Sequence, residues 1–262
     1  MTEQQKASIP ATVFNRRQLL GGLGALTAVT VIGCNSKDDS STTTVTTTDS
    51  SSSTTDSSST TVDGNCVIIP TETQGPYPLL AFLSNSAVRR QDITDGKTGV
   101  VLTVKLKLVN VNDSCKPLAN TAVYIWHCDK DGSYSGYSSG QNGDHTSESF
   151  LRGVQVTDSN GEVTFTTIYP GWYPGRITHI HFQAYLANNL NVTAIATSQM
   201  AFPAQVTTAV YNSSLYTHGQ NTSVTSFAAD GIFSDGVTYQ LATVTGDVAT
   251  GYVASLTAGI AA

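Results

Sequence analysis

Two histidines and two tyrosines in the second half of the chain have side chains that could hold a metal ion together. His179 and His181 are separated by one residue, and side chains on a strand alternate between its faces, so both imidazoles would lie on one side. Tyr173, in the turn before them, could add a phenolate, and Tyr134 a second. Two neutral imidazoles and two hard anionic oxygens suit a hard, highly charged metal, so ferric iron is the natural candidate and copper(I) is not.

Ordinary packing would explain the same residues. A His-x-His pair in a β-rich protein can belong to the core or to a solvated face, and Trp172-Tyr173 beside Pro-Gly could form an aromatic corner. Common zinc signatures are missing, since the chain has neither a Cys-x-x-Cys pair nor a His-Glu-x-x-His helix. The spacing alone therefore leaves metal binding and packing both open.

A longer series of segments resembles a known family. The matching segments, in order, are residues 71–77, 90–93, 123–134, 150–153 and 167–182, with weaker matches at 198–200 and 230–233. The most specific of them is Pro-Gly-Trp-Tyr-Pro followed by His-Ile-His. From Thr71 to the C-terminal region the chain resembles the intradiol ring-cleavage dioxygenases, the catechol and protocatechuate dioxygenases, which use non-haem ferric iron.

The resemblance implies a set of iron ligands and a reaction. The ligands it implies are Tyr134, Tyr173, His179 and His181. Tyr137 lies close to the first of these, but the distance from Trp126 matches the family only for Tyr134. The implied reaction inserts both atoms of O₂ into a catechol-type ring between its hydroxyl-bearing carbons and gives a muconate-type diacid. Neither the particular catechol nor the oligomeric state follows from the sequence.

Three further residues match positions around the iron of this family. Tyr173 corresponds to an axial tyrosine that leaves the iron as substrate binds and helps to take a substrate proton. Arg176 corresponds to an arginine near the iron, and its guanidinium could stabilise negative charge on the substrate, although a surface salt bridge is the alternative. Gln199 corresponds to a glutamine that lines the pocket, and we expect Tyr77 near its mouth.

Two other functions remain open at this point. A surface-tethered binding module could keep the same fold without catalysis, although all four ligand positions and Arg176 are intact. A zinc or copper protein could use the same histidines, but zinc sites are built from Cys, His and carboxylate, which disfavours a site with two tyrosines.

The composition predicts an all-β domain over residues 64–262. Charged residues make up only 12% of the chain, while Val, Thr and Tyr are abundant, which favours strands. We expect strands over 100–109, 120–126, 153–157, 162–168, 178–186, 194–202 and 237–244, and a helical turn near 206–211. An Asn-Gly turn predicts that 153–157 and 162–168 form a hairpin. The predicted fold is an antiparallel β-sandwich with long site-forming loops.

The sequence of the N-terminal quarter of the chain predicts an export signal and a linker, and no folded domain. Residues 1–34 contain Arg16-Arg17 before a short apolar run that ends at Cys34, as in a twin-arginine export signal with a lipidation site. Residues 35–63 are almost entirely Ser, Thr and Asp, which predicts a disordered linker or a glycosylated stalk. The expected location is extracytoplasmic, either anchored to a membrane through Cys34 or periplasmic.

Charge excludes one class of partner. The net charge is −6, and removing residues 1–33 makes it −8. Nucleic-acid binding needs a basic patch, and none is visible, so we expect no nucleic-acid partner. The partners that the resemblance implies are a catechol-type small aromatic substrate and O₂.

Three cysteines would face an oxidising compartment once Cys34 is acylated. Cys115 and Cys128 flank one predicted strand, which would hold them about 30 Å apart if it is straight, at about 3.3 Å per residue. A disulfide must then join Cys66 to one of them, and we favour Cys128 because both Cys66 and Cys128 neighbour site-forming segments. Three free thiols are the alternative.

Overall fold

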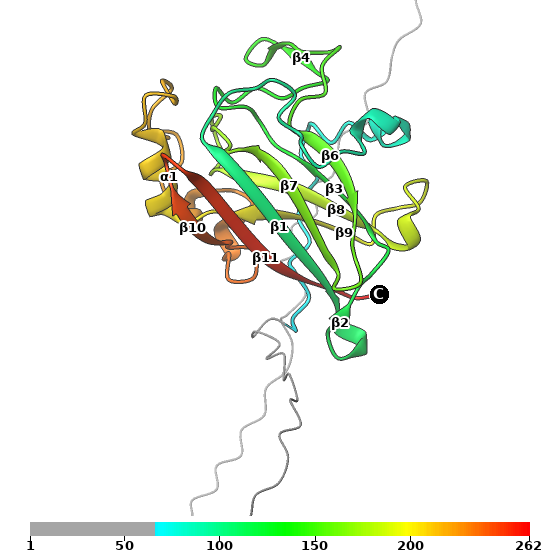
Figure 1. Cartoon of the computed structure of the whole chain (residues 1–262). Helices are drawn as coiled ribbons and strands as arrows, with labels where there is room; N and C mark the ends of the chain where they lie inside the picture. Colours follow the sequence, from blue (N-terminus) through cyan, green and yellow to red (C-terminus); the bar gives the residue numbers. More distant parts are fainter. Residues whose placement is uncertain (1–65) are drawn as a thin grey trace, which may run out of the picture. The chain divides into compact units, whose positions relative to one another are not determined.

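Two packed β-sheets make up most of the structure, a computed structural model that describes residues 66–262 (Figure 1). The first sheet has the order β10 (Thr243–Asp247), β11 (Gly251–Ile260), β1 (Val101–Asn110) and β2 (Lys116–Pro117), with β7 (Glu162–Ile168) also paired to β1. The second has the order β6 (Arg152–Val156), β3 (Ala122–Trp126), β8 (His179–Tyr185) and β9 (Ala196–Ala201).

Shorter elements occupy the connections between these strands. They are η2 (Leu80–Ser84), η3 (Ser86–Val88), η4 (Val111–Asp113), η5 (Leu186–Asn188), α1 (Ala204–Tyr211), η6 (Phe227–Ala229), η7 (Phe233–Asp235) and the small hairpin of β4 (Ser138–Ser139) and β5 (Gly143–Asp144). The predicted helical turn near 206–211 is confirmed by α1.

The main hydrophobic core lies between the two sheets. Alternate residues of β1, among them Leu102 and Leu106, are buried, as the apolar alternation of this segment predicts. Ile125 of β3 and Ile180 and Phe182 of β8 meet them from the second sheet. The predicted β-sandwich is confirmed, with one departure from an antiparallel arrangement, since β1 and β11 run parallel.

The predicted hairpin of residues 153–157 and 162–168 is wrong. Both strands exist as β6 and β7, but β6 pairs with β3 in one sheet and β7 with β1 in the other. The turn between them is tight, because the Asp158 carboxylate accepts hydrogen bonds from the N–H groups of Asn160 and Glu162. The residues of a turn indicate where the chain reverses direction, but not which strands the two flanking segments pair with. Here the turn connects a strand of one sheet to a strand of the other.

The C-terminal strands also differ from the prediction. The strand expected over 237–244 begins only at Thr243, as β10, and β11 was not predicted. Alternate residues of β11 are buried, but two of them, Ala254 and Ala258, are alanines, which makes the alternation hard to see in the sequence.

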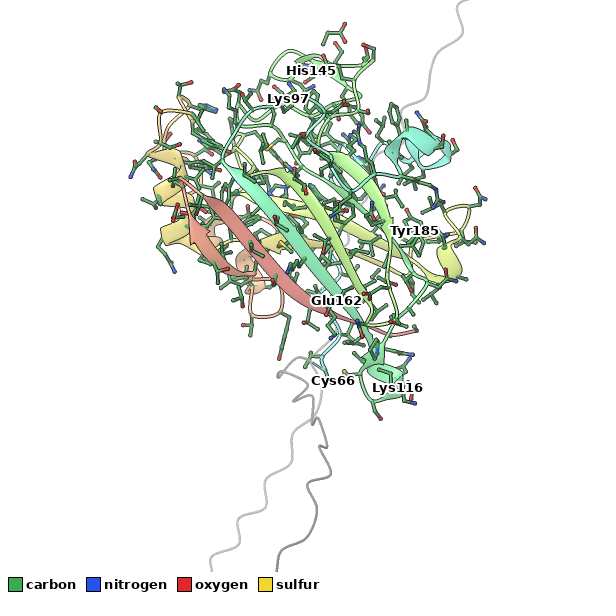
Figure 2. The ribbon with its side chains drawn as sticks, viewed as in Figure 1. Cys66, Lys97, Lys116, His145, Glu162 and Tyr185 are labelled. Carbon is green, nitrogen blue, oxygen red and sulfur yellow. A yellow bond between two sulfur atoms is a disulfide. The ribbon has the colours of Figure 1, made fainter. Side chains whose placement is uncertain are left out.

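The disulfide joins Cys66 to Cys115, so the favoured pairing with Cys128 is wrong. Figure 2 places Cys66 at the end of the sandwich that carries Lys116 of β2, opposite the end that carries His145. The bond therefore ties the start of the described chain to the β1–β2 turn. Cys128 lies beyond the far end of β3, where it is a buried free thiol.

The predicted export signal, linker and Cys34 lipidation site lie outside the described residues. Within residues 66–262 no helix combines the length and apolar character that crossing a membrane requires.

Candidate metal centre

Strand β8 carries the two histidines on the face that points away from the inter-sheet core. Ile180 and Phe182 point into the core, so the alternation of the strand sends His179 and His181 to the opposite face. There the two Nε2 atoms lie 3.0 Å apart, and both side chains are buried. The predicted convergence of the two imidazoles is therefore present.

Hydrogen bonding orients His179 for metal binding. Its Nδ1–H donates to the Ile177 carbonyl at 2.6 Å, which leaves the Nε2 lone pair directed at His181. Burial, helped by the nearby Arg176 charge, lowers the pKa of His179 to about 3. Burial also lowers the pKa of His181, whose ring stacks on Trp126 with an interplanar angle of 2°. Both imidazoles are thus held neutral, the form that ligates metals.

Tyr173 reaches the histidines from the loop between β7 and β8. Its hydroxyl lies 3.2 Å from His179 Nε2. Burial raises the pKa of this phenol to about 12. A cation at this position would reverse that effect, because it favours the phenolate.

Tyr134 is buried beside Tyr173, with ring centroids 5.7 Å apart. Its hydroxyl has no hydrogen-bond partner among residues 66–262, which is unusual for a buried phenol. The side chain of Asn142 holds the Tyr134 backbone on both sides, accepting from its N–H at 2.5 Å and donating to its carbonyl at 2.8 Å. Tyr137, the rejected alternative, instead accepts a hydrogen bond from Leu79 N–H.

The loops that carry the two tyrosines cross at very close range. Gly132 has φ +91°, and a Cβ atom there would lie 2.4 Å from the Trp172 carbonyl oxygen. Asp129 organises the same turn by accepting hydrogen bonds from Asp131 N–H and Ser133 N–H. The close crossing brings Tyr134 and Tyr173 together although they are far apart in sequence.

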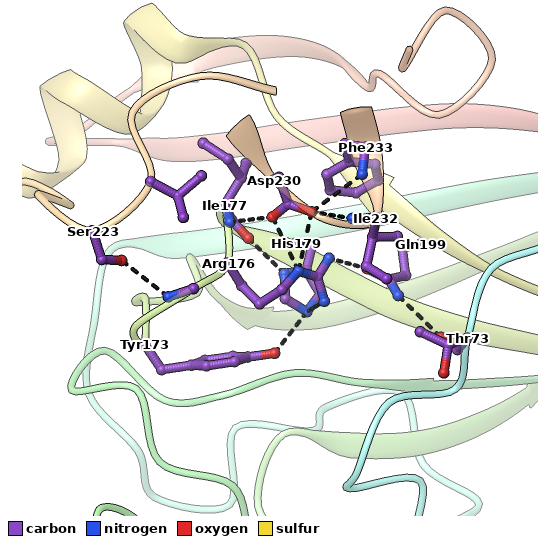
Figure 3. Close-up of polar contacts among 12 residues, drawn as sticks. Thr73, Tyr173, Arg176, Ile177, His179, Gln199, Ser223, Asp230, Ile232 and Phe233 are labelled. Carbon is purple, nitrogen blue, oxygen red and sulfur yellow. Dashed lines mark hydrogen bonds and ion pairs between the residues drawn. The ribbon is translucent and has the colours of Figure 1, made fainter. Parts of the chain in front are cut away.

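Arg176 lies beside the histidines and is fixed by a buried carboxylate (Figure 3). Its Nε lies 3.0 Å from Asp230 Oδ2, and its two terminal nitrogens reach His179 Nε2 at 3.4 Å and Gln199 Oε1 at 2.5 Å. The arginine is therefore partly buried at the site and pairs with a buried carboxylate, so it does not form the surface salt bridge considered above.

Asp230 has the environment of a permanent anion. Burial alone would raise its pKa, but hydrogen bonds from the N–H groups of Ile177, Ile232 and Phe233, together with the charge of Arg176, bring the pKa below its ordinary value. The carboxylate holds Arg176 in place and also anchors the chain just before β8.

Gln199 lies next to Arg176, and its amide connects two parts of the site. It accepts a hydrogen bond from Arg176 and donates to the Thr73 carbonyl at 3.0 Å. Opposite His181 on β9, it therefore links the arginine to the N-terminal segment.

That N-terminal segment, residues 72–79, covers the outer face of the second sheet, and we call it the strap. Tyr77 of the strap stacks on Tyr134, with ring centroids 4.7 Å apart. Gly75 has φ +68°, and a Cβ atom there would lie 3.1 Å from His181 Cε1, so only glycine allows this approach without displacement. The strap therefore contacts two of the four predicted ligand residues.

The donor set fits ferric iron better than the alternatives. No group of three or more His, Cys, Asp and Glu side chains within residues 66–262 is placed to hold a metal ion. Further donors must come from the two phenols, one of which is buried without a partner. Phenolate oxygens with imidazole suit Fe(III) and are unusual for zinc.

A pocket of about 280 Å³ opens beside Tyr173. Tyr77, Trp172 and His218 line it, and the loop that follows Tyr134 contributes Asn142. A second pocket, of about 310 Å³, is lined by residues of α1 and the 220–227 loop and by none of the four predicted ligands.

Sequence reasoning missed the residues that hold the site together without binding the metal. Asn142 fixes the Tyr134 backbone and Asp230 fixes Arg176, and both lie in loops without periodicity. Gly75 and Asp230 fall within segments that resemble the family, and that was the only signal available for them.

Comparisons with known proteins show the family of the chain. A sequence profile for the family described as Dioxygenase matches residues 74–250. An intradiol ring-cleavage dioxygenase from Tetranychus urticae is 29% identical with a TM-score of 0.64, covering 74% of this chain and 95% of that chain. Another crystallised dioxygenase is 30% identical with a TM-score of 0.64, covering 74% of this chain and 94% of its own.

A third structure is the dioxygenase domain of a dioxygenase carbohydrate-binding protein fusion from Streptomyces sp. SirexAA-E, 25% identical with a TM-score of 0.49, covering 73% and 96% of the two chains. No curated protein matches the chain. The profile spans well over half of the sequence, and the chain therefore belongs to the dioxygenase family, among the intradiol ring-cleavage dioxygenases.

Proposed function

We propose that the protein is a non-haem Fe(III) intradiol dioxygenase that cleaves a catechol-type substrate. The ring bond between the two hydroxyl-bearing carbons breaks, each of these carbons gains one atom of O₂, and the product is a muconate-type diacid. Membership of the family supports ring cleavage, while the metal, the substrate and the product are the proposal.

One observation carries the proposal. The two histidine Nε2 atoms face each other at 3.0 Å, with the Tyr173 hydroxyl 3.2 Å from one of them. On the same side Tyr134 presents a buried phenol that has no hydrogen-bond partner in the described part of the chain. Such an arrangement is costly without a cation, because buried polar atoms normally find partners. Tyr134, Tyr173, His179 and His181 would hold Fe(III), which activates a bound catecholate toward O₂.

We assign proton transfer to Tyr173. This residue lines the pocket, and burial raises the pKa of its phenol to about 12, so a Tyr173 phenolate that no cation stabilises would take up a proton readily. The proton acceptor for the substrate hydroxyl would then be Tyr173 Oη. Tyr134 is fully enclosed, so it would remain a ligand.

Arg176 supplies a fixed positive charge next to the reacting groups. Asp230 and Gln199 hold its guanidinium, which leaves one terminal nitrogen near His179 Nε2. A preorganised cation in a dry site stabilises negative charge that grows on the substrate in the transition state. Asp230 and Gln199 would position Arg176 for this role.

Colour and oxygen uptake test this function together. Purified protein loaded with Fe(III) should show a tyrosinate-to-iron charge-transfer band and should consume O₂ with a panel of substituted catechols. Iron content is measured by elemental analysis, and a ring-opened diacid is identified by mass spectrometry with ¹⁸O₂, which should place both labelled atoms in the product.

Two outcomes would remove the proposal. A colourless protein that retains no iron after exposure to Fe(III) would contradict the metal site. A coloured protein that binds catechols but consumes no O₂ would favour a surface-tethered, non-catalytic binding module.

We further propose that the protein is exported and lipidated at Cys34. The disulfide between Cys66 and Cys115 supports an oxidising compartment, since such bonds are rare in the cytosol. Labelled fatty acid should be incorporated into the wild type and not into Cys34→Ala. Equal labelling of both, or of neither, would refute lipidation at this residue.

A further inference from the structure

We propose that Arg152 is a positioning residue for the metal centre, because it fastens the strap to the loop that presents Tyr134. Arg152 belongs to β6, where it pairs with Trp126, and its side chain lies on the same outer face of the sheet as the site. It touches neither a predicted ligand atom nor the pocket. The inference rests on the proposed iron function.

The Arg152 guanidinium connects segments that are distant in sequence. It donates to the Tyr77 carbonyl at 2.7 Å, to the Ser135 carbonyl at 2.7 Å and to Ser135 Oγ at 2.9 Å. It also donates to Tyr124 Oη at 3.0 Å, and that hydroxyl donates in turn to the Pro78 carbonyl at 2.8 Å. Two strap residues and the residue after Tyr134 are thereby tied to one cation.

The charge environment of Arg152 is unusual. Its side chain is fully buried, with 0% exposure, yet it takes part in none of the ion pairs formed within residues 66–262. All its hydrogen-bond acceptors are neutral oxygens. Burying a charge without a carboxylate partner costs folding free energy. If this position needed only packing, an apolar side chain would therefore be more stable there.

The position of the charge explains what it contributes. The guanidinium carbon lies 6.0 Å from the centroid of the Tyr134 ring, the ligand that would bind iron as an anion. Tyr77, held by Arg152 through its carbonyl, stacks on the Tyr134 ring. Without Arg152 the Tyr77 carbonyl and both Ser135 oxygens would lose this donor, and the strap would be held less firmly against the Tyr134 ring.

The experiment compares three variants of the full-length protein. Arg152→Met removes every guanidinium donor. Tyr124→Phe removes the link to Pro78 and the Arg152 hydrogen bond to Tyr124 Oη, and leaves the contacts of Arg152 with Tyr77 and Ser135. Leu106→Ala lies in the inter-sheet core and serves as a control for lost stability. For each, Fe(III) affinity is measured by chelator competition well below the melting temperature, and amide hydrogen exchange is followed in the iron-free protein over residues 74–79 and 133–137.

Arg152→Met should bind Fe(III) roughly 10- to 100-fold more weakly, the usual cost of losing a residue that supports a metal ligand. Exchange should accelerate in both segments. Tyr124→Phe should show the same changes to a smaller extent and in the strap above all. Leu106→Ala should melt at a lower temperature with unchanged iron affinity, so a merely structural role for Arg152 would make the two variants alike.

Wild-type iron affinity and wild-type exchange in Arg152→Met would overturn the inference. If that variant does not fold, Tyr124→Phe decides, since unchanged exchange over 74–79 in that variant would overturn the inference equally. Wild-type protein that binds no iron would remove the proposed function instead, and exchange in the iron-free variants would still decide whether Arg152 holds the strap.

Discussion

Both faces of β8 are buried, but one face carries apolar side chains and the other carries polar side chains. The inner face presents Ile180 and Phe182 to the opposite sheet, while the outer face presents His179 and His181 to the strap and loops. Apolar contacts are non-directional, so the inner face needs only suitable volume. Each buried polar group of the outer face needs a partner in a defined direction.

This difference explains why the site lies where it does. Strands of the opposite sheet pack against the inner face, as in any sandwich, and leave no room there for water or for a metal ligand. The outer face is completed by irregular segments, the strap and the loops that carry Tyr134 and Tyr173, which can place donors at chosen distances. One strand can therefore contribute to the stability of the core through the face packed by strands, and to the metal site through the face covered by loops.

The largest expected effect comes from exchanging one residue on each face. His179→Ala should lose iron and activity almost completely, because it removes one of four protein ligands. Ile180→Ala, its neighbour on the other face, should keep the iron affinity but lose about 2–5 kcal/mol of unfolding free energy. Elemental analysis and urea denaturation measure the two quantities. Tyr134→Phe should behave like His179→Ala, and wild-type iron content in either would refute the ligand assignment.

Arg176→Ala should separate catalysis from metal binding on the outer face. Iron and colour should remain, while kcat falls roughly 10²- to 10³-fold, the typical effect of losing a preorganised charge. Steady-state oxygen uptake and the visible spectrum measure the two properties. Arg89→Ala, at an exposed arginine, is the control. Loss of colour in Arg176→Ala would make the residue structural, and near-normal turnover would place it outside the active site.

Polar burial should also make stability depend on pH in a way that aliphatic burial cannot. Burial lowers the pKa of His127 to about 4, and its two ring nitrogens are bonded to the Cys128 carbonyl and Thr167 Oγ1. Between pH 6.5 and 4 the unfolded chain therefore binds a proton that the folded protein does not. The contribution to stability is full above pH 6.5 and falls with pH, by about 3 kcal/mol at pH 4 for this residue alone.

Urea denaturation of iron-free protein at several pH values between 7 and 4.5 measures this slope. The histidines of the metal centre add to it, since burial lowers the pKa of His179 to about 3. His127→Gln should have a shallower slope than the wild type. A flat profile in the wild type would show that these imidazoles are hydrated in solution.

The smallest effect is expected from Tyr137→Phe. Tyr137 is near Tyr134 in sequence, but its hydroxyl only accepts a hydrogen bond from Leu79 N–H, so its loss should cost about 1 kcal/mol of stability. The charge-transfer band and turnover should be unchanged. A variant that alone loses its colour would show that the wrong tyrosine was chosen as ligand.

Elements with strong periodicity could be predicted from the sequence. The strands at Val101–Asn110 and His179–Tyr185 were predicted within a residue or so, because alternating burial is written directly into residue type. The alanine-rich Gly251–Ile260 was missed because small residues blur the alternation. The Cys66–Cys115 disulfide was not predicted, since pairing depends on where two turns meet in space.

The sequence by itself determined the sandwich class, the shared face of His179 and His181, and, through family resemblance, the residues that would bind iron. Only the tertiary structure decided that Asp230 pairs with Arg176, that Asn142 clamps Tyr134, and that Arg152 ties the strap to its loop. Strand alternation is a local property of the backbone, readable from neighbours in sequence. Hydrogen bonds between loops are directional and join segments far apart in the chain, so no local pattern records them.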